Sequence, residues 1–263
     1  MRVRVQALNQ AAFRPGYLRR GVALLGLALS TCAQAPTDPA ARAEFGRNNA
    51  PAEPTNRAIF RANQFVDRNA IQPVARGYQD YVPGAMRRGL HNFVQNLGEP
   101  GIAVNDVLQG NLGRAWNTTQ RFAINTSLGG AGLFDVAARW ERPHHDADFG
   151  QTLGVWGVGP GPAVQLPLFG PSNVRDGFGK LAGIVTNPVS FVPGGAVAAI
   201  RGVSGGIGTV DGRAGLLATT DDLERSSLDY YATLRSITAQ RRAAFVAEGK
   251  AGKVNASAGA GAP

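Results

Sequence analysis

The sequence predicts an all-α protein built from short amphipathic helices, which are separated by irregular segments rich in glycine and proline. First, apolar residues recur at helical spacing over much of the chain, whereas the alternation typical of strands is scarce. Second, the chain contains 35 glycine and 16 proline residues without a collagen-like period, which demands many turns. Third, 44% of the 263 residues are hydrophobic, which is enough to build a core and excludes a disordered chain.

The formal net charge of +9 does not indicate a nucleic-acid partner, because much of it is concentrated at the N-terminus. Five arginines and no acidic residue precede residue 21. Without that segment, 22 basic and 18 acidic residues leave a net charge of only +4. This is too small to argue for a polyanionic partner, and we expect no binding to nucleic acid.

Residues 1–31 have the order of a lipoprotein signal peptide. A basic segment ends at Arg20, and the uncharged run that follows is too short to span a bilayer as a stable helix. The only cysteine of the chain, Cys32, comes directly after this run, and residues 29–32 resemble a bacterial lipobox. We therefore expect Cys32 to be lipidated and to anchor the protein in a membrane.

The alternative is ordinary cleavage near Ala33 to Ala35, which would discard the cysteine. A single cysteine forms no internal disulfide in either case. Alanine rather than aspartate follows Cys32, which agrees with export to the outer membrane instead of retention at the inner one. The expected location is therefore the periplasmic side of the outer membrane.

Residues 32–54 are rich in alanine, proline, asparagine and threonine, and they are predicted to form the lipidated N-terminus and a flexible tether. The folded domain is predicted to span residues 55–248. Its first part contains four short helices, with starts predicted near Thr55, after Pro83, at Pro100 and at Leu112. The second of these is expected to stop at Gly98, and the fourth to end near Asn125.

Two long uncharged runs occupy the middle of the chain, 26 residues at 149–174 and 20 residues at 181–200. Such lengths normally indicate a transmembrane helix. Prolines and glycines exclude a regular helix in the first run and break the second into Leu181–Thr186 and Ala196–Ile200. Irregular backbone at membrane depth must be buried in protein or line a wet cavity, so we predict a bent hairpin or shallow insertion, with a glycine-rich soluble core as the alternative.

A single amphipathic helix is predicted from Thr220 to Glu248. Acidic residues dominate its first turn, and Arg241 and Arg242 lie near its end, an order that suits the helix dipole. The tail at 249–263 consists mostly of alanine, glycine and serine and is predicted to be disordered.

The pattern of residues 202–206 fits the nucleophile elbow of serine hydrolases, with Ser204 as the nucleophile. In that fold the histidine follows the serine, whereas His91, His144 and His145 all precede it, and no alternation of strands and helices surrounds it. We therefore expect no catalytic residue and no enzyme activity. A periplasmic lipase that uses Ser204 is the enzymatic alternative.

No cofactor or metal site is predicted. His144, His145 and Asp146 are adjacent, so the two histidines point to different faces, and no further ligand is near in sequence; we expect a solvated loop. Gly179 and Lys180 lack the upstream glycine and the following hydroxyl residue of a phosphate-binding loop.

A series of short motifs runs along residues 55–245 in a characteristic order. In chain order, the motifs are Asn56-Arg57-Ala-Ile-Phe60, Tyr81-Val-Pro83, Asn92-Phe93, Asn96-Leu97, Glu99-Pro100, Leu108-Gln-Gly110, Arg121-Phe122, Asn125-Thr126, Gly129-Gly-Ala-Gly132, Asp135-Val-Ala137, Phe149-Gly-Gln-Thr-Leu-Gly154, Gly157-Val-Gly159, Gly161-Pro162, Leu166-Pro167, Gly170 and Arg175-Asp176. In this order they resemble the MlaA (VacJ) family of phospholipid-transport lipoproteins.

This resemblance implies an all-helical ring that lies in the inner leaflet of the Gram-negative outer membrane, surrounds an amphipathic channel and associates with trimeric porins. It also implies a function. Phospholipid misplaced in the outer leaflet would pass through the channel to a soluble periplasmic carrier, MlaC, for retrograde transport, and lipid asymmetry would be maintained. The alternative is a structural lipoprotein that associates with porins but moves no lipid.

In a channel with a polar side for the head group and an apolar side for the tails, both parts of a phospholipid keep favourable surroundings. We therefore expect the lipid to move down its own gradient without a nucleotide. The residues expected on the polar side are Asn125, Thr126 and Arg175. The residues expected at the apolar membrane rim are Val189, Phe191, Val192 and Val197.

Overall fold

Helices form almost all of the regular structure in the computed structural model, which describes residues 52–186 and 192–253. The signal peptide, Cys32, nearly all of the tether and the rim residues Val189 and Phe191 lie outside the described residues. The helices are α3 (Glu53–Val66), the π-helical η1 (Asp67–Ile71), α4 (Gln72–Tyr81), α5 (Gly84–Leu108), α6 (Leu112–Ser127), α7 (Val136–Arg139), α8 (Phe149–Val155), α9 (Val174–Thr186), α10 (Gly195–Ser226) and α11 (Tyr230–Ala251). The predicted all-α class is confirmed.

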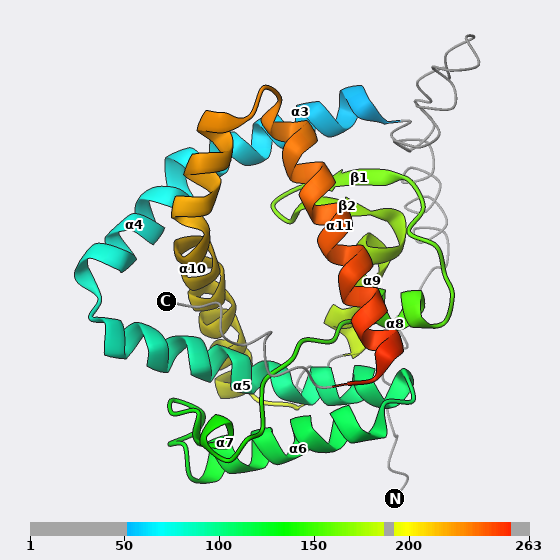
Figure 1. The fold of residues 1–263 in the computed structure, drawn as a ribbon. Coiled ribbons are helices and arrows are strands. Elements are labelled where there is room, and N and C mark those ends of the chain that lie inside the picture. Colours follow the sequence, from blue (N-terminus) through cyan, green and yellow to red (C-terminus); the bar gives the residue numbers. More distant parts are fainter. Residues whose placement is uncertain (1–51, 187–191, 254–263) are drawn as a thin grey trace, which may run out of the picture.

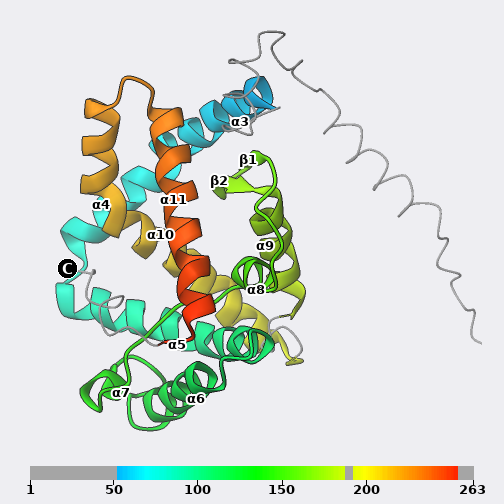
Figure 2. The same cartoon turned by 45° about the vertical axis from the view of Figure 1, so that its right-hand side comes forward.

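The elements are arranged as a ring of helices (Figure 1). Helices α3, α4 and α5 follow one another along three sides, and α8, α9 and a small hairpin complete the fourth. Helix α10 packs against α4 and α5, whereas α11 packs against α8 and β2 on the other side, so the two helices diverge from the turn that joins them (Figure 1). Helices α6 and α7 lie as a second layer at the α5 end in both views (Figures 1 and 2). Within the described parts of the chain, no helix combines the length and apolarity needed to cross a bilayer.

The helices are not uniformly short, since α5, α10 and α11 contain 25, 32 and 22 residues. Their predicted boundaries were wrong in several places. The first helix begins at Glu53 rather than after a Thr55 cap, with proline in its first turn. It continues through η1 into α4, where Pro73 removes a backbone donor and crowds the carbonyl four residues earlier, a cause of π-helical turns.

Helix α5 passes through Gly98 and Pro100 without a break, contrary to the prediction of two helices. A proline inside a helix costs about 3 kcal/mol. Helix α5 nevertheless continues because one of its faces is buried against α6, from Asn96 through Glu99 and Ile102 to Asp106. The next helix, α6, begins at Leu112 as predicted.

The first uncharged run contains helix α8 and an antiparallel hairpin of β1 (Ala163–Leu166) and β2 (Gly170–Asn173), which the sequence analysis missed. The side-chain amides of Asn56 and Asn63, two turns apart on α3, bind the free edge of β1. Asn56 donates to the Ala163 carbonyl at 3.0 Å and accepts from the Gln165 amide at 2.8 Å. Asn63 binds the backbone of residues 166 and 168 in the same way, at 2.8 and 2.9 Å.

Helices α8 and α9 cross at Gly150 and Gly179. A β-carbon on Gly179 would lie 2.4 Å from the Gly150 nitrogen, so this crossing excludes any larger residue there. The pieces predicted at Leu181–Thr186 and Ala196–Ile200 are parts of the longer helices α9 and α10.

No helix starts at Thr220. Helix α10 continues to Ser226, and after a short turn α11 begins with Asp229 as its cap, whose carboxylate accepts from the Ala232 amide. The acidic residues near 220 therefore lie at the end of α10, where the dipole disfavours them. Each of them is compensated by an ion pair, Asp221 with Arg76, Asp222 with Arg225 and Glu224 with Arg68. Helix α11 extends beyond Gly249 and ends at Gly252, which has a left-handed φ of 65°; residues 254–263 lie outside the description.

Candidate functional site

The space between α5, α6 and the segment 142–148 has a charged interior. Arg121 of α6 is almost fully buried, and its Nε donates to Glu99 of α5 at 2.8 Å. A second nitrogen of the same guanidinium donates to Asp135 at 3.0 Å, and the third donates to the Arg142 carbonyl. This arginine therefore connects two helices and the connection that follows them.

A second buried pair lies two helical turns away. Arg114 of α6 donates from Nε to Asp106 of α5 at 3.2 Å, and from its other nitrogens to the Asp146 carbonyl and to Glu248 of α11. The spacing explains why both pairs form. The arginines are seven residues apart, as are the carboxylates Glu99 and Asp106, and seven residues return to the same face of a helix.

The segment around the two histidines is not the solvated loop that we predicted. His145 is 2% exposed, and its Nε2 lies 2.8 Å from Asp106. His144 has Nδ1 at 3.1 Å from Glu99 and Nε2 at 3.4 Å from Asp146. Burial lowers the pKa of His144, but the contacts with Asp146 and Glu99 outweigh it and raise the pKa to about 9. His144 is therefore protonated at neutral pH.

These groups bind one another. Within the described ranges, no cluster of three or more histidine, cysteine, aspartate or glutamate residues could hold a metal ion. Ser204 does not lie at a strand-to-helix turn either. It is buried in the middle of α10, where its hydroxyl donates to the Arg201 carbonyl at 3.1 Å. The structure therefore contradicts the nucleophile elbow.

Helix α6 has the reverse of the usual amphipathic pattern. Its buried residues are mostly polar or charged, namely Arg114, Ala115, Asn117, Thr118, Arg121 and Asn125. Its outward face instead exposes Leu112 and Trp116, which are four residues apart and 68% and 61% exposed. Large apolar residues near this helix are exposed as well, at Val107, Leu128, Phe134 and Trp140. An apolar face of this kind fits an apolar surrounding.

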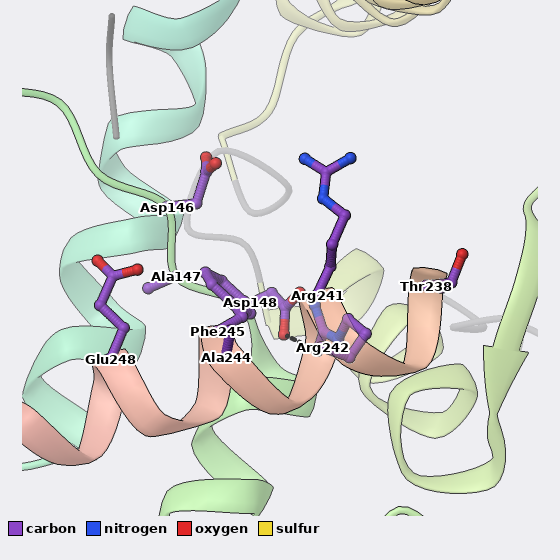
Figure 3. A pocket seen from close by; sticks show the side chains of 9 residues that line it. All are labelled: Asp146, Ala147, Asp148, Thr238, Arg241, Arg242, Ala244, Phe245 and Glu248. Atoms are coloured by element: carbon purple, nitrogen blue, oxygen red, sulfur yellow. Dashed lines mark hydrogen bonds and ion pairs between the residues drawn. The ribbon is translucent and has the colours of Figure 1, made fainter. Parts of the chain in front are cut away.

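A pocket of about 620 Å³ lies between α11 and residues 146–148, next to the charged interior (Figure 3). Its volume falls in the range of small-molecule binding sites. Residues of one face of α11 and of the segment beside it line this pocket, namely Asp146, Ala147, Asp148, Thr238, Arg241, Arg242, Ala244, Phe245 and Glu248.

One wall of the pocket is fixed by Arg242. Its guanidinium binds both carboxylate oxygens of Asp148, at 2.7 and 3.0 Å, and both of Asp176 on α9, at 2.9 and 3.0 Å. Burial raises the pKa of Asp176, but the bonds from Arg175 and Arg242 outweigh it and hold the pKa below its usual value. Asp148 also caps α8 by accepting from the Gln151 amide at 2.7 Å. This wall is therefore held by several elements at once.

Two charged side chains of the pocket remain available. Arg241 is exposed and extends from α11 to the side on which Asp146 projects (Figure 3). Among residues 52–186 and 192–253 it has no hydrogen-bond or ion-pair partner. The side chain of Asp146 is 78% exposed, with one oxygen facing His144. The pocket thus presents a cation and an anion to the same space.

The structure does not bring together the residues predicted for the polar side of a channel. Asn125 is buried at the end of α6, where it donates to Asp135 and accepts from the Ala137 amide. Thr126 beside it is exposed and accepts from Asn96. Arg175 is buried at the start of α9 against Asp176.

Of the predicted rim, only Val192 and Val197 are described; Val192 is 52% exposed. The sequence analysis missed Arg241 and Asp146 as pocket residues. The spacing of Thr238, Arg241 and Phe245 places them on one face of α11, but only folding brings residues 146–148 opposite that face.

Comparisons with known proteins all match the same family. Residues 48–245 match the family model described as MlaA lipoprotein. The chain is 37% identical over 243 residues to the intermembrane phospholipid transport system lipoprotein MlaA of Escherichia coli (strain K12), covering 88% of this chain and 90% of that protein. It is 31% identical over 215 residues to the protein of the same name from Haemophilus influenzae, covering 79% and 83%.

A solved structure is similar as well. It was reported under the heading "Structural basis for maintenance of bacterial outer membrane lipid asymmetry". It matches with a TM-score of 0.65 and 34% sequence identity, over 75% of this chain and 98% of that one.

Proposed function

The chain belongs to the MlaA lipoprotein family. We propose that it is the lipoprotein component of a phospholipid transport system that maintains the lipid asymmetry of the outer membrane. In this role it removes misplaced phospholipid from the outer leaflet. It moves lipid and does not cleave it.

The observation that carries this proposal is the inverted helix α6. Its charges are buried against α5, and Leu112 and Trp116 face outward. Exposing large side chains to water forgoes about 1.5 to 3 kcal/mol each, whereas a lipid leaflet removes that cost. Trp140 adds an exposed indole, a side chain enriched where hydrocarbon meets head groups. The α6 end of the ring accordingly lies in the membrane.

The transport step follows from the cost of moving a lipid. Each methylene exposed to water costs about 0.8 kcal/mol, so a lipid with two long chains needs apolar shielding along its whole path. Its head group needs polar partners at the same time. We propose that the interior of the ring supplies both, with the lipid tails along the apolar rim and the head group along polar residues. The energy for net transport comes from outside this chain.

The anchor, the porin and the carrier are proposed from what membership of the MlaA family implies. Cys32 anchors the protein at the periplasmic side of the outer membrane, and residues 55–248 form the transport domain. A trimeric porin holds the ring in the leaflet, and the soluble carrier MlaC receives the lipid. Asn125, Thr126 and Arg175 remain the candidates for the polar side, and Val189, Phe191, Val192 and Val197 those for the rim.

The test is phospholipid at the cell surface. In a strain that lacks this chain, a membrane-impermeant amine reagent should label surface phosphatidylethanolamine, and the wild-type gene should abolish that label. A Leu112→Asp/Trp116→Asp double variant should fail to do so, because it places two charges on the face that enters the leaflet. Arg139→Gln, an exposed change on α7, is the matched control and should restore asymmetry. An unlabelled deletion strain would refute the proposal.

A reconstituted assay separates transport from a purely structural role. The lipoprotein and its porin are placed in vesicles that contain labelled phospholipid, and soluble carrier is added. We expect carrier-bound lipid only when the lipoprotein is present. A structural lipoprotein would give none.

A further inference from the structure

The pocket beside α11 offers opposite charges to one bound molecule. Arg242 forms ion pairs with both Asp148 and Asp176, so none of these three charges is available to a ligand. Glu248 forms an ion pair with Arg114 through one of its carboxylate oxygens. Arg241 has no partner within the described residues. One carboxylate oxygen of Asp146 lies 3.4 Å from Nε2 of His144, but the side chain is 78% exposed and can still accept from a ligand. A ligand that fills the pocket therefore meets one available cation and one available anion.

Resting on the proposed function, we propose that this pocket binds the head group of a zwitterionic phospholipid, with Arg241 on the phosphate and Asp146 on the ammonium. Guanidinium matches phosphate because its fixed donors bind two oxygens at once. A carboxylate pairs with a primary ammonium in the same charge-assisted way. Ala147, Ala244 and Phe245 give the pocket an apolar lining beside these charges, which suits the glycerol portion.

The arrangement also sets a preference. An anionic head group such as phosphoglycerol also binds Arg241, but it brings no cation for Asp146, and its phosphate lies near that carboxylate. Like charges brought together are a general means of rejecting a competing ligand. The position of Asp146 is well fixed, because its backbone carbonyl accepts from the buried Arg114 at 3.0 Å. The pocket therefore favours phosphatidylethanolamine over phosphatidylglycerol.

The experiment uses the mature lipidated protein in detergent with equimolar short-chain phosphatidylethanolamine and phosphatidylglycerol, and it counts bound lipid by native mass spectrometry. Wild type should prefer the ethanolamine lipid by roughly tenfold, the effect of one charge-assisted contact. Arg241→Gln should weaken both lipids by a similar factor of roughly ten. Asp146→Asn should remove the preference by weakening only the ethanolamine lipid. Asp80→Asn and Arg139→Gln are exposed controls outside the pocket and should change neither lipid.

The possible failures are distinguishable. If wild type binds neither lipid, the proposed function itself is wrong. If wild type binds both lipids equally, or if Asp146→Asn keeps the preference, lipid binding stands but the head-group site is overturned. Competition identifies the chemistry recognised, because phosphoethanolamine should displace the lipid far better than inorganic phosphate. Equal displacement by the two would show a simple anion site and would also overturn the proposal.

Discussion

Two helix pairs of this molecule pack by opposite rules. Between α4 and α10 the buried residues are apolar, with Ala75, Ala214 and Leu217 in a small cluster, and the charged residues lie at the surface. Between α5 and α6 most of the buried residues are polar or charged, and large apolar side chains of α6 face outward. Both pairs belong to one ring (Figure 1).

Burial in this protein therefore does not follow hydrophobicity alone. A charge removed from water is tolerated only when it is paired and its remaining hydrogen-bonding positions are used. Arg114 and Arg121 meet this condition, since each contacts a carboxylate on α5 and groups beyond it. The outward apolar face of α6 has no such compensation in water, so the second pair is matched to a different surrounding from the first.

The largest effect is expected from Arg121→Met. Removing this arginine leaves Asp135 without its cation and Glu99 with His144 alone, so the free energy of unfolding should fall by about 3 to 5 kcal/mol. The measurement is denaturant unfolding of the mature protein in detergent.

Leu217→Ala is the comparison in the apolar pair and should cost about 2 to 4 kcal/mol, through a cavity rather than an unpaired charge. The double variant Glu99→Gln/Arg121→Met separates the two mechanisms, because it should lose less than the sum of its single changes. Strict additivity would contradict a coupled charged interior.

A pH-dependent effect is expected at His144. Its pKa is raised to about 9 in the folded protein and is about 6.5 when unfolded, so its stabilisation is complete below pH 6.5 and is lost as the pH rises towards 9. The loss amounts to at most about 3 kcal/mol. The groups that face His144 are Glu99 of α5 and Asp146 of its own segment. Unfolding at pH 6 and pH 9 measures the loss.

His144→Gln should have a smaller decrease over the same pH interval. Its stability at pH 9 should be close to that of wild type, because the ionised histidine no longer contributes there. A decrease as steep as that of wild type would show that another group is responsible.

The smallest effect is expected from Arg76→Ala in the first pair. Its partner Asp221 is at 2.8 Å, but the arginine side chain is 52% exposed, and exposed ion pairs contribute about 0 to 1 kcal/mol. The change should also disappear in high salt. A loss as large as that of Arg121→Met would remove the distinction between the two pairs.

Part of this structure follows from the sequence. Periodicity predicts the helical class and the start of α6 at Leu112, because both depend on local spacing. It misplaces boundaries that distant contacts decide. Pro100 remains inside α5, and Asp221 lies within the last turns of α10 instead of at the start of a helix. The sequence predicts a solvated loop at His144 and Asp146, because no local pattern shows that Glu99 and Arg114 lie beside them. The pocket could not be predicted for the same reason.

The contacts of Asn56 and Asn63 with the β1–β2 hairpin affect how neighbouring copies of the protein can associate. An unsatisfied strand edge is a template on which further chains polymerise. Here Asn56 and Asn63 occupy the outer backbone groups of β1, and β2 contacts α11 on its other side. Within the described residues, β1 therefore offers a neighbouring copy no free backbone edge on which a further strand could pair.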